Sequence, residues 1–195
     1  AKLGLHIGDQ VKVEKGGEII PKIVGVVIEA REKDMWPVEF PHRCPECGTE
    51  LVRYEGEAQH YCPNEHSCPP QITGRIEHFV GRKMMAIDGL GGETVAELVE
   101  AGLIHDVADL YELTTNRLLS LGKGWGTKSA EQVIAGIAAS KNIPFEQVLF
   151  AIGIRHVGEA TAKELARHFG SLDPIMDAST EQLLAVSDVG PIVAQ

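Results

Sequence analysis

Residues 44–68 of this 195-residue chain read CPECGTELVRYEGEAQHYCPNEHSC and contain all four of its cysteines. The cysteines form a C-x2-C pair, Cys44 and Cys47, and after 14 residues a C-x5-C pair, Cys62 and Cys68. A tetrahedral zinc ion needs four thiolates at about 2.3 Å, and a C-x2-C turn presents two of them from one side. We therefore predict a structural zinc site filled by the four cysteines, with no open position for a substrate.

Two alternatives fit the same spacing, namely two disulfides or four thiols buried independently. Disulfides would suit a small secreted domain, but the N-terminus lacks the charged and apolar layout of an export signal. His42, His60 and His66 lie close by and could each replace one cysteine. Because four thiolates already complete a tetrahedron, we expect these imidazoles to lie outside the ligand set.

The segment before the cysteines has the alternation of β-strands. Residues 11–14 (VKVE) alternate between apolar and charged, and residues 19–28 are rich in β-branched side chains. Pro21 cannot donate to a strand ladder and is expected at an edge or bulge. The pattern predicts a small all-β unit over residues 9–30, compatible with an OB-like barrel, an SH3-like barrel or part of a larger sheet. Residues 31–42 lose the alternation and are expected to be a linker.

Beyond Cys68 the apolar residues follow a helical period and a repeat is present. Four glycines spaced by 35, 32 and 32 residues each follow one apolar residue and open an amphipathic segment. The four pairs are Leu90-Gly91, Trp125-Gly126, Val157-Gly158 and Val189-Gly190. The repeat predicts an all-α domain of four helical hairpins, the last of them cut short by the end of the sequence.

In the first two copies a second glycine precedes the apolar residue, as Gly89-Leu90-Gly91 and Gly124-Trp125-Gly126. Two glycines allow a tight turn with φ > 0, while the apolar side chain fills the gap between the helices. The turn then exposes backbone N–H groups at the start of the next helix, where the helix dipole favours an anion. We expect these turns to bind nucleic-acid phosphates without reading bases, as helix-hairpin-helix motifs do. The alternative is an ordinary helix pair joined by a glycine turn.

The third and fourth copies lack the first glycine and have His156 and Asp188 in its place. His156, with Gly158, could still donate to a phosphate, whereas Asp188 would repel one, so we expect the fourth copy only to pack. Lys128 lies beside the second turn and is a further candidate phosphate contact. In the β unit, Lys15 and Lys22 flank a Gly-Gly turn and are candidates for DNA contact, with solvated strand lysines as the alternative.

The charge balance limits how a nucleic acid could be bound. Eighteen Lys and Arg against 28 Asp and Glu give a net charge of −10, which excludes a strongly basic coat protein. In blocks of about forty residues, residues 121–160 alone are net positive, at +1. Backbone N–H groups at defined positions must therefore supply most of the phosphate contacts. No apolar run reaches the roughly 18–20 residues of a membrane span, and we expect a soluble, cytoplasmic protein without a membrane partner.

The order of these parts resembles the C-terminal half of bacterial NAD-dependent DNA ligases. The sequence similarity is greatest in residues 85–91 (MAIDGLG), 106–113 (DVADLYEL), 126–130 (GTKSA) and 149–158 (LFAIGIRHVG). Residues 121–126 (LGKGWG) are one residue longer than the usual form of that family. The resemblance implies a multidomain α+β chain with part of a small OB-like barrel (1–40), a four-cysteine zinc finger (41–70) and an all-α tandem helix-hairpin-helix domain (71–195).

In that family a separate domain carries a K-x-D-G lysine that takes AMP from NAD, and no K-x-D-G occurs in this chain. The chain also begins inside the β unit, so we expect a fragment without the adenylating domain, inactive alone. The resemblance implies that the full-length protein is a monomeric ligase for repair and replication. It would use NAD and Mg²⁺ to seal nicks in double-stranded DNA of any sequence. The alternatives are a non-enzymatic DNA-binding repair module and a DNA-binding partner of a nuclease.

Overall fold

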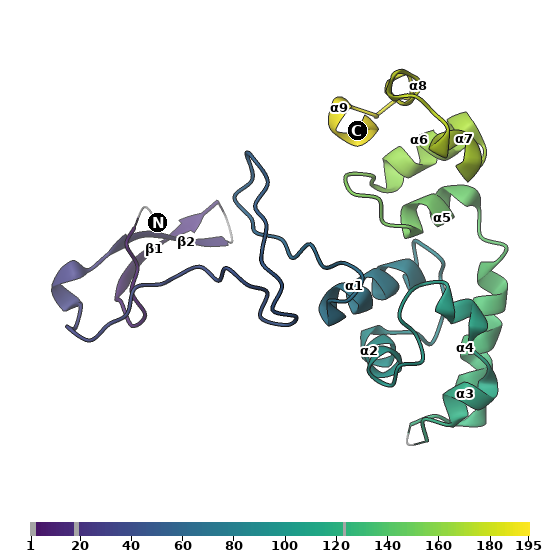
Figure 1. Cartoon of the computed structure of the whole chain (residues 1–195), viewed down its shortest axis with the longest axis horizontal. Coiled ribbons are helices and arrows are strands. Elements are labelled where there is room, and N and C mark those ends of the chain that lie inside the picture. The colour runs from purple at the N-terminus through teal and green to yellow at the C-terminus, as the bar shows by residue number, and fades with distance from the viewer. Residues whose placement is uncertain (1–2, 18–19, 123) are drawn as a thin grey trace. The chain divides into compact units, whose positions relative to one another are not determined.

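The computed structural model describes residues 3–17, 20–122 and 124–195, and it divides into two compact units, Ala1–Tyr61 and Cys62–Gln195 (Figure 1). Glu18, Ile19 at the start of the expected second strand, and Lys123 before the second hairpin turn lie outside the described residues. The division falls within the predicted zinc finger. Among the helices of the described ranges, none combines the length and the apolar character needed to cross a bilayer.

The first unit contains an antiparallel strand pair, β1 (Val11–Gly16) and β2 (Ile20–Val26), followed by the 3-10 turn η1 (Ile28–Ala30). This confirms strands within residues 9–30. Lys15 lies opposite Pro21, and the register shifts between Lys12 and Val13. Pro21 is tolerated because in a two-stranded sheet every strand is an edge.

A closed OB-like barrel is not confirmed by the described residues. Their regular sheet has two strands, and most of its apolar side chains are exposed to solvent, with Val11 and Val26 half-buried. Ile20 is 73% exposed and Val13 is 53% exposed. Two strands cannot bury a face without a second layer, so the described residues of this unit do not form the hydrophobic core expected of a barrel.

The predicted linker over residues 31–42 takes part in the first unit. The N–H of Ile7 donates to the carbonyl of Trp36 (2.8 Å), and the N–H of Val38 donates to the carbonyl of Leu5 (2.8 Å). His6 and Pro37 thus form an isolated antiparallel bridge. The interpretation of this stretch as a simple linker was incomplete, because a bridge this short has no alternation to reveal it.

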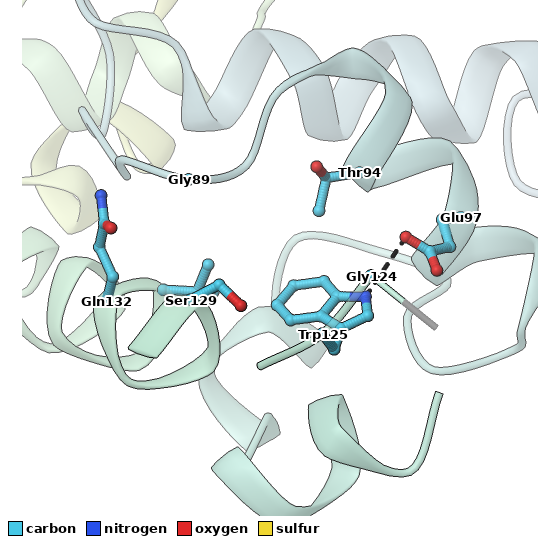
Figure 2. Close-up of a pocket in the computed structure, with 8 residues that line it drawn as sticks. Gly89, Thr94, Glu97, Gly124, Trp125, Ser129 and Gln132 are labelled. Carbon is cyan, nitrogen blue, oxygen red and sulfur yellow. Dashed lines mark hydrogen bonds between the residues drawn. The ribbon is translucent and has the colours of Figure 1, made fainter. Parts of the chain in front are cut away.

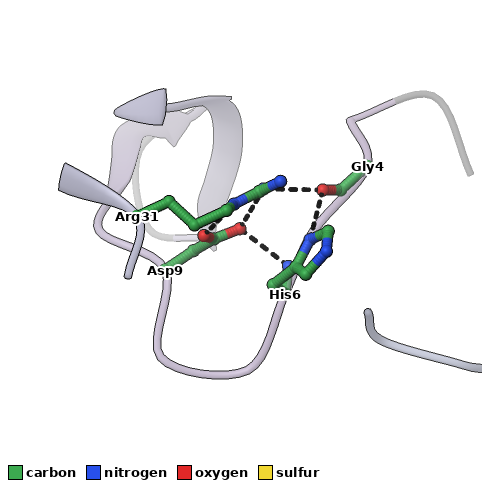
Figure 3. A network of polar contacts seen from close by, with 4 residues as sticks. All are labelled: Gly4, His6, Asp9 and Arg31. Carbon is green, nitrogen blue, oxygen red and sulfur yellow. Dashed lines mark hydrogen bonds and ion pairs between the residues drawn. The ribbon is translucent and has the colours of Figure 1, made fainter. Parts of the chain in front are cut away.

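Asp9 and Arg31 join the start of the first unit to the segment that follows η1 (Figure 3). Arg31 Nε donates to Asp9 Oδ1 at 2.8 Å and Arg31 Nη2 donates to Asp9 Oδ2 at 2.7 Å. The same carboxylate accepts from the N–H of His6 at 2.7 Å, and Arg31 also donates to the carbonyl of Gly4. The Asp9 side chain is shielded from solvent. A bidentate pair of this kind fixes both chain segments at once.

The second unit is built of helices, as the repeat predicted. In chain order they are α1 (Pro69–Val80), α2 (Gly92–Glu100), η2 (Asp109–Glu112), α3 (Thr115–Leu119), α4 (Thr127–Ser140), α5 (Phe145–Ala151), α6 (Glu159–Phe169), α7 (Leu172–Met176), α8 (Thr180–Leu184) and α9 (Pro191–Ala194).

These helices share two apolar cores, one for each pair of hairpins. The core of the first pair includes Ile76, Leu90, Val95, Leu98, Leu118 and Val133. The core of the second pair includes Leu149, Val157, Ala162, Leu165, Val186 and Val189. The apolar residue of each turn therefore packs inside, as expected, although Trp125 is only partly buried against the first core.

Breaking the Asp9–Arg31 pair should destabilise the first unit in a pH-dependent way. The hydrogen bonds from Arg31 lower the pKa of the Asp9 carboxyl, and the N–H of His6 adds to this effect. A lowered pKa stabilises the folded state above the unfolded value of about 3.9, and this contribution is lost as the pH falls through the folded pKa. Asp9→Asn should therefore unfold more easily at pH 7 and lose less stability than the parent on acidification.

The measurement is denaturant unfolding followed by Trp36 fluorescence in a Trp125→Phe background, since these are the two tryptophans of the chain. The exposed Asp34→Asn is the matched control. Parallel pH profiles for Asp9→Asn and the parent would contradict a stabilising role for the pair.

Candidate metal centre and nucleic-acid interface

The four cysteine side chains converge on one point. Their Sγ atoms all lie within 4.8 Å of one another. Thiolates at 2.3 Å from a tetrahedral ion lie about 3.8 Å apart, so this set fits a single zinc ion with little adjustment. Cys44 and Cys68 are buried and Cys47 and Cys62 half-buried, which limits access of water to the centre.

The first pair is held by the backbone of its own turn. The N–H of Cys44 donates to the carbonyl of Thr49 (2.8 Å), and the N–H of Gly48 donates back to the carbonyl of Cys44 (2.9 Å). Gly48 has a φ of +70°, which few other residues adopt. Cys47 Sγ lies 3.2 Å from the hydroxyl oxygen of Thr49. The two thiols are thus preorganised to face the same side.

The neighbouring imidazoles do not belong to the cysteine cluster. His42 and His66 are exposed, and the ring of His60 stacks on Phe40 with centroids 4.1 Å apart.

One backbone feature is shared by the four hairpin turns. The residue before the apolar residue of the turn has a positive φ in every copy: Gly89 (+88°), Gly124 (+102°), His156 (+67°) and Asp188 (+62°). His and Asp are among the few non-glycine residues enriched in this region. His156 and Asp188 therefore fill the same conformational position as the missing glycines.

The second glycine of each turn differs from the prediction. Gly91, Gly126, Gly158 and Gly190 are helix N-caps with negative φ, between −81° and −100°. Any residue can adopt this backbone, and the space around the missing Cβ is open at all four positions. At Gly89, in contrast, a Cβ would lie 2.9 Å from the side chain of Val133. The expectation of positive φ at both glycines was wrong, because only the first bends the chain.

The helices after the turns begin with unpaired backbone donors of the usual kind. The carbonyls of Gly91, Gly126 and Gly158 accept the first helical hydrogen bonds, from Val95, Ala130 and Ala162 at 2.9 to 3.0 Å. The first three residues of each of these helices have no helical carbonyl four positions earlier to accept from their N–H groups. Those N–H groups therefore point out of the N-terminal end of the helix. At α9 the first of these residues is Pro191, which has no N–H.

The first two turns border a pocket of about 150 Å³ (Figure 2). Gly89 and Thr94 line it from the first hairpin and Gly124 and Ser129 from the second. The indole N–H of Trp125 donates to Glu97 on α2 at 3.3 Å, which ties the second turn to the first hairpin. The sequence reasoning missed Thr94 and Ser129, which both occupy the third position of their helix. The Ser129 hydroxyl caps α4, since it accepts from the N–H of Gly126 at 3.1 Å and donates to its carbonyl at 2.9 Å.

The charges at the helix starts differ between copies. The first turn of α4 carries Lys128, which is exposed, and no acidic residue. Those of α2 and α6 carry Glu93 and Glu159, and Glu159 pairs with Lys83 at 2.8 Å. Among α2, α4 and α6, the N-terminus of α4 in the second hairpin is therefore the most favourable for a phosphate.

Lys15 and Lys22, the other predicted DNA contacts, are exposed on β1 and β2. Lys22 lies opposite Glu14 in the strand register. Among the described residues of the first unit, no pocket is lined by both lysines. Their contact with DNA stays a prediction.

Comparison with protein families agrees with this geometry. Residues 43–69 match the NAD-dependent DNA ligase C4 zinc finger domain. Residues 81–139 match the SAM-like helix-hairpin-helix tandem, and residues 147–195 match the helix-hairpin-helix motif. The predicted zinc finger and helix-hairpin-helix repeats are confirmed.

Several proteins named DNA ligase are similar to the chain over nearly all of its length. The identity is 57% over 193 residues with that of Phocaeicola vulgatus, and 58% over 194 residues with that of Parabacteroides distasonis. Each alignment covers 99% of this chain. With the protein of Chlorobium luteolum the identity is 50% over 194 residues. The chain spans only about 29% of the length of the first two relatives.

We expect one zinc ion per molecule and a stabilising role for it. Cys62→Ser should lower the thermal stability of the chain, because a site with three thiolates binds the metal more weakly. Elemental analysis of freshly purified protein measures the zinc, and thermal unfolding compares the variant with an exposed Ser67→Ala control. Zinc-free protein with all four thiols in disulfides would contradict the prediction.

Proposed function

We propose, from its resemblance to NAD-dependent DNA ligases along almost its whole length, that this chain is the DNA-binding part of such an enzyme. One observation carries the proposal: a ligase-type C4 finger is followed in the same chain by four hairpins with one shared turn geometry. The matched relatives are named DNA ligase, and no finding favours a non-enzymatic repair module.

The hairpins would bind the DNA backbone through the N-terminal N–H groups of their second helices. The open space beside Gly91, Gly126 and Gly158 supports this role, since a phosphate can approach the amides where a side chain would stand in its way. Lys128 adds one charge at α4. Because these donors do not touch base edges, binding is independent of sequence, as sealing nicks at any position requires.

The fourth hairpin would contribute packing and little DNA contact. It has the turn geometry, but Asp188 places a negative charge beside it and Pro191 removes an N–H from the start of α9. Its helix is also only four residues long and has a weak dipole. Val189 nevertheless fills the second core as the other turn residues fill theirs.

The zinc finger would be structural. We propose Cys44, Cys47, Cys62 and Cys68 as its ligands, since a closed set of thiolates leaves no position for a substrate. Residues 41–70 are too few to hold a core without metal, so zinc would give the finger a fixed shape. NAD and Mg²⁺ would serve the adenylation chemistry of the whole enzyme, for which this chain offers no K-x-D-G lysine.

We further propose that β1 and β2 are two strands of an OB-like barrel. Val13 and Ile23 lie opposite each other in the strand register and are both exposed, which supports this, because an apolar face is normally covered by further strands. Lys15 and Lys22 would then contact DNA phosphates from the barrel surface. The whole enzyme would act as a monomer on nicked duplex DNA in the bacterial cytoplasm.

Blocking the approach to the helix ends should weaken DNA binding without unfolding the protein. Gly91→Val and Gly126→Val keep a backbone that valine adopts readily, so both should fold normally. Each should lower the affinity for nicked duplexes of unrelated sequence about tenfold, as expected for losing one or two hydrogen bonds to a charged phosphate. Fluorescence anisotropy measures the affinity and circular dichroism the fold.

Gly190→Val is the matched control, since it changes an N-cap of the same geometry where no DNA contact is proposed. Lys128→Ala should reduce the slope of log affinity against log salt by about one unit. If the folded Gly91→Val and Gly126→Val variants bind as tightly as the parent, the hairpins are packing elements and the proposal fails.

The chain alone should neither take AMP from NAD nor seal a nick, because the nucleophilic lysine of the family motif is not part of it. Incubation with NAD and Mg²⁺ should leave its mass unchanged, while a full-length ligase treated in the same way gains one AMP. Mass spectrometry makes the comparison. A covalent adenylate on this chain would show that the adenylating residue had been assigned to the wrong region.

A further inference from the structure

The second cysteine pair is fastened to the helix that follows it. Cys68 is the N-cap of α1, and its carbonyl accepts from the N–H groups of Gln71 (3.0 Å) and Ile72 (3.1 Å). The N–H of Cys68 donates to the carbonyl of Asn64 at 3.0 Å. The last thiol of the finger and the first turn of α1 are therefore one piece of backbone.

A side chain of α1 holds the other cysteine of the pair. Gln71 Nε2 donates to the carbonyl of Cys62 at 3.0 Å and to that of Asn64 at 3.4 Å. These carbonyls lie at the start of the C-x5-C loop, and Gln71 itself is half-buried. One amide group thus fixes the distance between the first and the last thiol of the loop.

Arg75 continues the same contact one helical turn later. Its Nη2 donates to the carbonyl of Glu65, in the middle of the loop. Residues four apart share a helix face, so Gln71 and Arg75 form a single clamp on the loop. The other side of α1 packs into the first core through Ile76 and Val80, which are buried. The helix therefore connects the cysteine loop with the core of the first hairpin pair.

The clamp has an energetic consequence for metal binding. Ordering the loop before the ion arrives removes part of the entropy cost of bringing the thiolates together. Groups that orient metal ligands typically change metal affinity by about 10- to 100-fold. Coupling between two events is reciprocal, so bound metal must in turn stabilise the loop and the first turn of α1.

We propose that Gln71 and Arg75 are positioning residues that couple zinc binding at Cys62 and Cys68 to the folding of α1, and through α1 to the first hairpin. The inference rests on the zinc site of the proposed function and is independent of DNA binding. Zinc occupancy then sets how firmly the first hairpin is held, in addition to shaping the finger.

The first test measures zinc release from the zinc-loaded chain to an excess of a colorimetric chelator. Gln71→Ala should release zinc about tenfold faster than the parent, and Gln71→Glu, which keeps the size but removes the N–H donors, should behave in the same way. Gln147→Ala changes a half-buried glutamine on α5 and should release zinc at the parent's rate. Arg75→Ala should also accelerate release, and Arg75→Lys, which retains a donor, should restore most of the parent's rate.

The second test follows backbone amide hydrogen exchange. Removing zinc from the parent should accelerate exchange in α1, starting at Gln71 and Ile72, and leave α6 in the second core largely unchanged. In a variant with both Gln71→Ala and Arg75→Ala the loss of zinc should change exchange beyond residue 72 much less than in the parent, because the clamp is already absent. Circular dichroism confirms that the zinc-loaded variants are folded.

Parent-like release rates for both Gln71 variants would overturn the coupling, as would α1 amides that stay protected in the zinc-free parent. A lack of zinc in the purified protein would instead overturn the zinc site itself. Neither result depends on DNA, so a failure of the DNA-binding proposal is detected separately, by the glycine variants.

Discussion

A single left-handed residue in each hairpin turn is the constraint on which the helical unit depends. At Gly89, Gly124, His156 and Asp188 the positive φ reverses the chain within a few residues. The next residue then points into a core, where Leu90 and Val157 are buried. The helix that follows consequently starts at the surface with its N–H groups directed outward. Core packing and the presentation of backbone donors are therefore two results of the same turn.

The two glycines of a turn consequently have different functions. The first satisfies a backbone requirement, and at Gly89 also a steric one, because Val133 lies next to it. The second has an ordinary extended backbone with open space around it, so its lack of a side chain matters for what approaches from outside. This separation explains how the fourth hairpin can keep the turn while Asp188 and Pro191 remove the features that favour a phosphate.

A chain with a net charge of −10 cannot attract DNA by a general positive field. The proposed binding through helix N-termini would avoid this difficulty, because the donors belong to the backbone and their number does not depend on the count of lysines. It does require the helix ends to be held firmly. The contacts of α1 with the cysteine loop, through Gln71 and Arg75, and the link between Trp125 and Glu97 would both serve that purpose.

The cysteine cluster, the strand pair, the four hairpins and their apolar turn residues could be predicted from the sequence, because spacing and period are properties of local backbone geometry. Which glycine bends each turn became clear from the three-dimensional structure, since that depends on neighbours such as Val133, which lies 44 positions from Gly89 in the sequence. The pairing of Leu5 with Val38, and of Asp9 with Arg31, likewise joins segments that carry no common pattern. Such contacts depend on how the chain closes its loops in space, and a one-dimensional pattern of residue types does not record that closure.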